Sequence, residues 1–192
     1  MEKQILKTLD ILRSHKDSEP AWAEIVALCR AAKKRMPWDS LPTPDIERDA
    51  RAASQWLSAE LQQQPNARCI ALALDTLNME DAAYNVQFVG TGAGEPDDGQ
   101  VGLLFEEDAT YGGQYLIPGL VELHQVYSQE NWEEAFTLCD YVLFLGYAGI
   151  ILTAALRQLP AGRNFLAALG FFDGDLFALG RKTPDGFTLI CR

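Results

Sequence analysis

The pattern of hydrophobic and polar positions is dominated by one apolar run within residues 131–160. Residues 141–156 carry no charge, and their large side chains surround a helical axis instead of forming one stripe. Asn131 and Glu134 form a capping-box start. The uncharged run of about 16 residues is shorter than the ~20 needed to cross a bilayer, and Asp140 blocks its extension. The pattern therefore predicts a long buried core helix and no membrane association.

Two glycines, Gly146 and Gly149, interrupt this apolar run. Each costs up to about 1 kcal/mol relative to alanine in a helix interior. Together with Ala148 they leave a flat patch that another backbone can approach closely. We therefore expect tight core packing at these glycines, with a kink there as the alternative.

Helical spacing of apolar residues predicts three helices in the first third of the chain. The first covers residues 2–14. A second follows Ser18 as its cap, with Pro20 in the first turn. The third runs from about 44 to 63, with Thr43 as its cap. This part of the chain is thus predicted to form a helical layer.

The middle of the chain has the patterns of strands. Residues 69–75 form a continuous apolar run of strand length, which predicts a central strand. Residues 82–90 alternate between apolar and polar side chains, which predicts a half-exposed strand paired antiparallel with the first. A third short strand is expected over 101–105.

Loops and turns separate the remaining elements. Residues 90–100 and 106–114 are acidic and contain glycine, so we expect two loops there. Pro118 is placed to start a helix, and a short helix is expected over 163–169. Residues 184–186 are Pro-Asp-Gly between two apolar segments, which predicts a C-terminal hairpin.

These elements predict a single α+β domain over residues 1–192. A helical layer is expected in 1–65, and a sheet plus the central helix in 68–192. The sheet should be small and mainly antiparallel, with the C-terminal β-hairpin joined to it. The strand order does not follow from the sequence.

The formal net charge of −11 argues against nucleic-acid binding, which needs clustered Lys and Arg. The basic run Lys33, Lys34 and Arg35 stands alone. Acidity favours solubility, and it also favours a basic protein partner attracted by the field of the protein.

The four cysteines stand at positions 29, 69, 139 and 191, with no CxxC pair among them. The first three lie in apolar patterns, where a free cysteine behaves as a small hydrophobe. Charges are scattered through the first residues of the chain, unlike a signal peptide. We therefore expect a reduced, cytoplasmic protein.

Motifs for cofactor and metal binding are incomplete. Gly90, Gly92 and Gly94 follow a predicted strand, but Glu95 stands where a dinucleotide fingerprint needs glycine. Zinc ligands usually occur at short Cys and His spacings, which this chain lacks. We expect no cofactor, no metal site and no catalytic constellation.

An enzyme that uses carboxylate acid–base chemistry remains the alternative. Its candidates are Asp140, Asp173 and Asp175. A buried carboxylate at Asp140 would require a partner, for which Arg163 and Arg181 are candidates. Structural roles, a salt bridge for Asp140 and turn chemistry for the other two, compete with this interpretation.

The leading hypothesis is a small acidic cytoplasmic protein-binding module. An immunity or inhibitor protein that neutralises a basic toxin or enzyme is one form of it. Its expected partner-binding residues are acidic or aromatic and lie in or beside loops. They are Glu95, Asp97, Asp98, Glu106, Glu107, Asp108, Tyr111, Tyr115 and Trp132. A homodimer that buries surplus apolar surface of the long helix is a further alternative.

Overall fold

The computed structural model describes residues 2–75, 85–91, 110–127, 139–171 and 176–190. Its helices are α1 (Glu2–Ser14), α2 (Ser18–Ala32), α3 (Ile46–Gln63), α5 (Pro118–Tyr127) and α7 (Leu145–Gln158), with a 3-10 turn η1 (Trp38–Ser40) and a π-helical segment η4 (Cys139–Phe144). Its strands are β1 (Cys69–Asp75), β2 (Asn85–Thr91), β3 (Thr110–Leu116), β4 (Phe165–Phe171), β5 (Leu176–Thr183) and β6 (Gly186–Leu189). The predicted α+β fold is confirmed.

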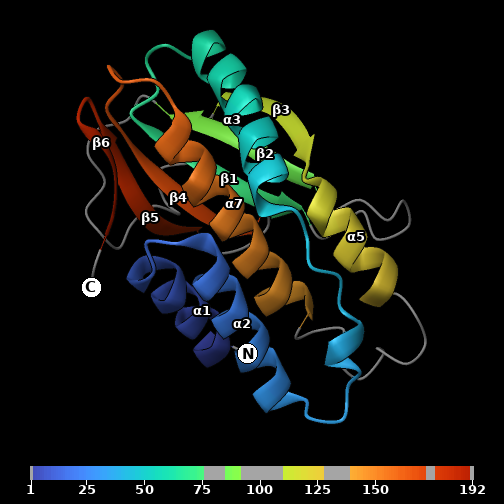
Figure 1. Cartoon of the computed structure of the whole chain (residues 1–192). Coiled ribbons are helices and arrows are strands. Elements are labelled where there is room, and N and C mark those ends of the chain that lie inside the picture. Colours follow the sequence, from blue (N-terminus) through green and yellow to red (C-terminus); the bar gives the residue numbers. More distant parts are fainter. Residues whose placement is uncertain (1, 76–84, 92–109, 128–138, 172–175, 191–192) are drawn as a thin grey trace.

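The described strands form one six-stranded sheet in the order β3-β2-β1-β4-β5-β6. The central pair β1 and β4 is parallel, and every other neighbouring pair is antiparallel. The predictions of a mainly antiparallel sheet, of the β1–β2 pairing and of a C-terminal hairpin in the same sheet are confirmed. Figure 1 shows α1, α2, α3 and α7 gathered over one face of this sheet.

The prediction of a short helix over 163–169 is wrong. Residues Phe165–Phe171 form β4, and all seven are buried. Alanine and leucine favour helices when isolated. Here the segment lies between β1 and β5 in the middle of the sheet, where an apolar strand is covered on both faces. The position of this segment in the sheet therefore outweighs its local preference for a helix.

The prediction of a loop over 106–114 is wrong for residues 110–114, which belong to the edge strand β3. The backbone N–H of Gly113 donates to Oε2 of Glu60 on α3 at 2.9 Å. A Cβ atom at Gly113 would lie only 2.6 Å from Glu60 Oε1. The glycines that suggest a loop therefore allow the α3 carboxylate to pack directly on the strand.

The three predicted N-terminal helices are confirmed, but the structure shifts two of their starts. The N-cap of α2 is Asp17, and Ser18 is the first helical residue. The N-cap of α3 is Asp45, not Thr43, because the Asp45 side chain accepts a hydrogen bond from the backbone N–H of Arg48 at 2.9 Å. The helix that Pro118 was expected to start is confirmed as α5.

The glycines of α7 are contact points, as predicted. A Cβ atom at Gly146 would lie 2.7 Å from Ile25 Cδ1 on α2. A Cβ atom at Gly149 would lie 2.9 Å from Leu169 Cδ2 on β4 and would also overlap Leu12 on α1. The neighbours are side chains instead of backbone. The helix is α-helical through both glycines, and the irregular π-helical segment precedes them.

The run Tyr141–Gln158 has the length and apolar character of a membrane-spanning helix, the one such helix found among the described residues. In this fold, however, 78% of that run is buried inside the protein. Its apolar side chains are therefore used for internal packing, which leaves little of α7 for the expected dimer contact. Its predicted start at Asn131 lies outside the described residues.

A buried lysine donates hydrogen bonds to backbone carbonyls at the C-terminal end of α7. Lys182 on β5 is only 2% exposed, and its Nζ donates to the carbonyl of Leu159 at 2.8 Å. Burial lowers the pKa of this lysine below its ordinary value. Its cation lies at the negative end of the helix dipole, which favours the charged form.

Cys29 and Cys69 pack as small hydrophobes, as expected. Burial raises the pKa of each thiol to about 12. We predict that an alkylating reagent at pH 8 leaves both unmodified in the folded protein and modifies both in urea, as measured by peptide mapping. Since unfolded thiols ionise near pH 9, these two groups should also lower the free energy of unfolding as pH rises from 9 to 12. Equal alkylation in the two states would contradict the burial.

Candidate partner-binding groove

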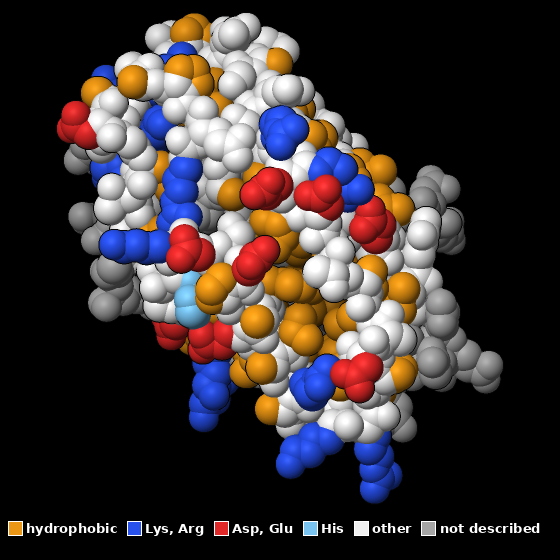
Figure 2. All heavy atoms as spheres, viewed as in Figure 1, with side chains coloured by type: hydrophobic (Ala, Val, Ile, Leu, Met, Phe, Trp, Pro, Cys, Tyr) orange, Lys and Arg blue, Asp and Glu red, His pale blue; other side chains and the backbone are white. Residues whose placement is uncertain are grey.

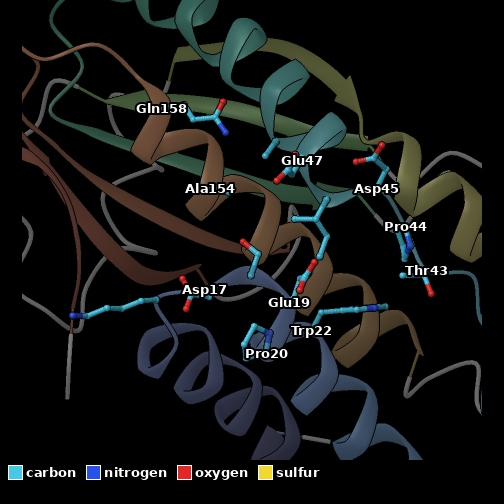
Figure 3. Close-up of a pocket in the computed structure, with 14 residues that line it drawn as sticks. Asp17, Glu19, Pro20, Trp22, Thr43, Pro44, Asp45, Glu47, Ala154 and Gln158 are labelled. Carbon is cyan, nitrogen blue, oxygen red and sulfur yellow. The ribbon is translucent and has the colours of Figure 1, made fainter.

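A hollow of about 980 Å³ opens between the N-terminal halves of α2 and α3, above the outer surface of α7. We call it the α2–α3 groove. Trp22 and Pro20 come from α2, and Ala154 and Gln158 from α7 (Figure 3). Ala50 of α3 completes the lining. Its walls thus come from segments that are far apart in the sequence.

The rim of the groove is acidic. Its four carboxylates all come from helix caps or first turns and are exposed: Asp17, Glu19, Asp45 and Glu47. With Lys16 as the one cation in the lining, the rim carries a net charge of −3, from four carboxylates and one lysine. Acidic residues in a first turn stabilise their own helix. In this fold the two first turns also border the same hollow, so their negative charges converge on it.

The floor of the groove is apolar. Trp22 is only 8% exposed, Ala50 is buried and Ala154 is half-buried. The small alanine side chains leave the hollow open, and the indole ring forms one side of it. Figure 2 shows hydrophobic side chains between acidic groups on this face of the molecule. The surface is suited to a ligand that carries both positive charge and apolar area.

On its side away from the groove, Trp22 packs against a buried aromatic residue. Its ring packs edge-to-face against Tyr147 of α7, with 5.2 Å between ring centroids and 70° between planes. The Tyr147 hydroxyl donates to Asp49 Oδ2 at 2.8 Å. Burial, and then the hydrogen bond to Asp49, raise the pKa of Tyr147 above its ordinary value, so the phenol remains a donor.

Asp49 is the centre of a buried polar network. Its side chain is 0% exposed and accepts from the backbone N–H of Gly119 at 2.7 Å and from Arg48 Nε at 2.8 Å, in addition to Tyr147. Arg48 also pairs with Glu122 of α5 at 2.9 Å. The network ties α3, α5 and α7 together directly behind the groove floor.

The sequence itself contains a signal that the Asp49 side chain is buried. Ile46, Ala50 and Ala53 recur at helical spacing, so they mark the buried face of the helix predicted over residues 44–63. Asp49 is three residues after Ile46 and four before Ala53, so it lies on that same face. A carboxylate on a buried helical face needs donors.

Of the nine partner-binding residues expected from the sequence, seven lie outside the described residues: Glu95, Asp97, Asp98, Glu106, Glu107, Asp108 and Trp132. The other two are on β3, and neither lines the groove. Tyr111 is 61% exposed. Tyr115 is half-buried and stacks on Trp56, with centroids 5.1 Å apart. Burial raises the pKa of Tyr115.

The candidates for carboxylate catalysis also lie outside what the structure describes. This applies to Asp173, Asp175 and the side chain of Asp140. Arg163, an expected partner of Asp140, donates to the carbonyls of Leu61 at 3.1 Å and Gln64 at 3.0 Å. It therefore supplies donors to the C-terminal end of α3.

No protein-family model, no curated protein and no solved structure matches this chain. Interpretation of the groove therefore depends on its own chemistry. Within the described part of the chain, no group of three or more His, Cys, Asp or Glu side chains is placed to hold a metal ion.

Proposed function

We propose that this protein is an acidic protein-binding module whose α2–α3 groove receives a basic, partly apolar segment of a protein partner. The observation that carries the proposal is the convergence of four rim carboxylates on an apolar floor in a hollow of about 980 Å³. An inhibitor or immunity protein that neutralises a basic toxin or enzyme in the cytoplasm is one form of this function.

The chemistry of the lining selects the class of partner. Lys or Arg side chains would place their charges beside Glu19 and Glu47 and their aliphatic stems on Trp22 and Ala154. A phosphate-bearing ligand would meet like charge at the rim. The net charge of −11 would also speed the approach of a basic protein over distances of about a Debye length.

Charge reversal at the rim should abolish capture of the partner. We predict that the double variant Glu19→Lys, Glu47→Lys retains less than about one tenth of the partner captured by the wild-type protein in pull-downs from its native host, because two attractive contacts become repulsive. Both side chains are exposed, so the fold should persist. Mass spectrometry identifies the captured protein, which is then purified and titrated against both forms by calorimetry.

The matched control is Glu106→Lys, Glu107→Lys, in the acidic segment that the sequence favours as the contact surface. Each pair of substitutions changes the formal net charge from −11 to −7, since each Glu→Lys adds two charges. Loss of binding by the rim variant alone supports the groove. Loss by the control alone would reject the groove and return the contact to the 106–108 segment, and equal binding by both would reject both surfaces.

A further inference from the structure

One face of α2 is exposed to solvent in the described part of the chain and carries small side chains. Ala23, Ala27 and Ala31 recur every four residues and are all exposed. Beside them a hollow of about 480 Å³ separates α2 from α1, with Ile11 and Leu28 in its lining. Small side chains on a helix allow a second helix to approach closely. The rest of the lining of the hollow is mainly charged or polar, with Lys7, Asp10, Ser14 and Glu24.

Along α2 the acidic side chains Glu19 and Glu24 precede the basic Arg30, and Lys16 before the helix is the exception to this order. Asp17 and Glu19 are exposed at the start, and the exposed run Lys33, Lys34 and Arg35 follows its end. The helix has 15 residues and is therefore about 22 Å long. Its acidic and basic ends are thus separated by more than two Debye lengths at physiological salt, where that length is about 8 Å.

We infer that two copies of this chain associate through their α2 helices, packed antiparallel about a two-fold axis near Ala27. A chain with net charge −11 generally repels its copy. The antiparallel arrangement overcomes this locally, because it places the basic end of each α2 against the acidic end of the other. The interface is isologous and closes as a dimer. The helix dipoles are also opposed, which favours the same arrangement.

The α2 face is a better dimer surface than α7, which the sequence suggested. Most of the apolar run of α7 is buried inside one copy, whereas the alanines of α2 are exposed. The α2 dimer does not depend on the proposed partner, although Glu19 belongs to both surfaces. Its test uses the purified chain alone, so its outcome is independent of groove binding.

The first test compares Ala27→Arg with Ala59→Arg by sedimentation equilibrium over a range of concentrations. Both alanines are exposed on helices, α2 and α3 respectively, so the two changes are chemically matched. We expect the wild-type protein and Ala59→Arg to approach twice the 21.3 kDa monomer mass at high concentration. Ala27→Arg should raise the dimer dissociation constant about tenfold or more, because it overpacks the closest contact.

A charge exchange provides the second test and does not depend on the Ala27 variant. Glu19→Lys alone and Lys34→Glu alone should each weaken the dimer, since each opposes like charges across the interface. The two changes in one chain should restore association to within about threefold of the wild-type value, the scatter expected of such contacts. A wild-type mass of 21.3 kDa at every concentration overturns the inference. A dimer dissociation constant that Ala27→Arg leaves unchanged also overturns it. The same holds if the losses of association caused by Glu19→Lys and Lys34→Glu add in the double variant.

Discussion

Replacing Asp49 with alanine is expected to lower the free energy of unfolding by about 3–5 kcal/mol. The Asp49 carboxylate is fully buried and accepts from Gly119 N–H at 2.7 Å and from the Tyr147 hydroxyl at 2.8 Å. Without it, both buried donors lose their acceptor, and each unsatisfied donor costs about 1–3 kcal/mol. Arg48 is partly exposed and is left with Glu122 and water. Urea denaturation measures the change.

Asp39→Ala is the appropriate control for this prediction. Its side chain is 94% exposed and pairs with Arg30 at 2.8 Å. An exposed ion pair contributes at most about 1 kcal/mol. Asp49→Asn should be intermediate, since the amide keeps one acceptor oxygen but adds a donor beside other donors. If Asp49→Ala and Asp39→Ala unfold at the same urea concentration, the buried network does not stabilise the fold.

The second large effect is expected at Gly119, where alanine should cost about 2–4 kcal/mol although it is the better helix former. An added Cβ atom would lie 2.6 Å from Asp49 Oδ2 and would overlap the Tyr147 hydroxyl. The side chain therefore displaces the carboxylate from two of its donors. Thermal and urea unfolding of Gly119→Ala measure the loss, with Gln125→Ala, an exposed change on the same helix, as the control.

A double-mutant cycle separates this network effect from simple crowding. In the Asp49→Ala background no carboxylate remains to be displaced, and the Tyr147 side chain, released from its hydrogen bond to Asp49, can shift away from the added methyl group. Gly119→Ala should then cost less than about 1 kcal/mol, which gives a coupling energy well above the ~0.5 kcal/mol scatter of independent sites. If the two losses simply add, the methyl group acts through some other neighbour and Asp49 is not the reason that position 119 is glycine.

An element of the fold is predictable from the sequence when the residues that determine it are close to one another in the chain. The strand Cys69–Asp75 and the turn between β5 and β6 were predicted because an uninterrupted apolar run and a Pro-Asp-Gly turn act within a few residues. Segment 165–171 was misassigned because its alanines and leucines favour a helix, and only its place between β1 and β5 makes it a strand. Gly112 and Gly113 suggest a loop until Glu60 is seen to occupy the space above them.

The groove could not be predicted, because no single segment contains it. Its lining comes from residues 16–22, 43–50 and 154–158, which meet only because α7 passes beneath the starts of α2 and α3. In the sequence, Glu19 and Glu47 are ordinary acidic residues in first turns. The sequence favours the acidic loops at 95–98 and 106–115 as the contact surface because of their local density of charge. For residues 95–98 and 106–109, which lie outside the described residues, this remains a prediction.

The most direct test of the proposed function is site-specific photo-crosslinking in the native host. A photoreactive benzoylphenylalanine replaces Gln158 inside the groove, Gln125 on the exposed face of α5, or Asp108 in the acidic segment favoured by the sequence. We expect a covalent adduct with one basic protein from the Gln158 position and none from the other two positions. An adduct from Asp108 or Gln125 with none from Gln158 would contradict the proposed function.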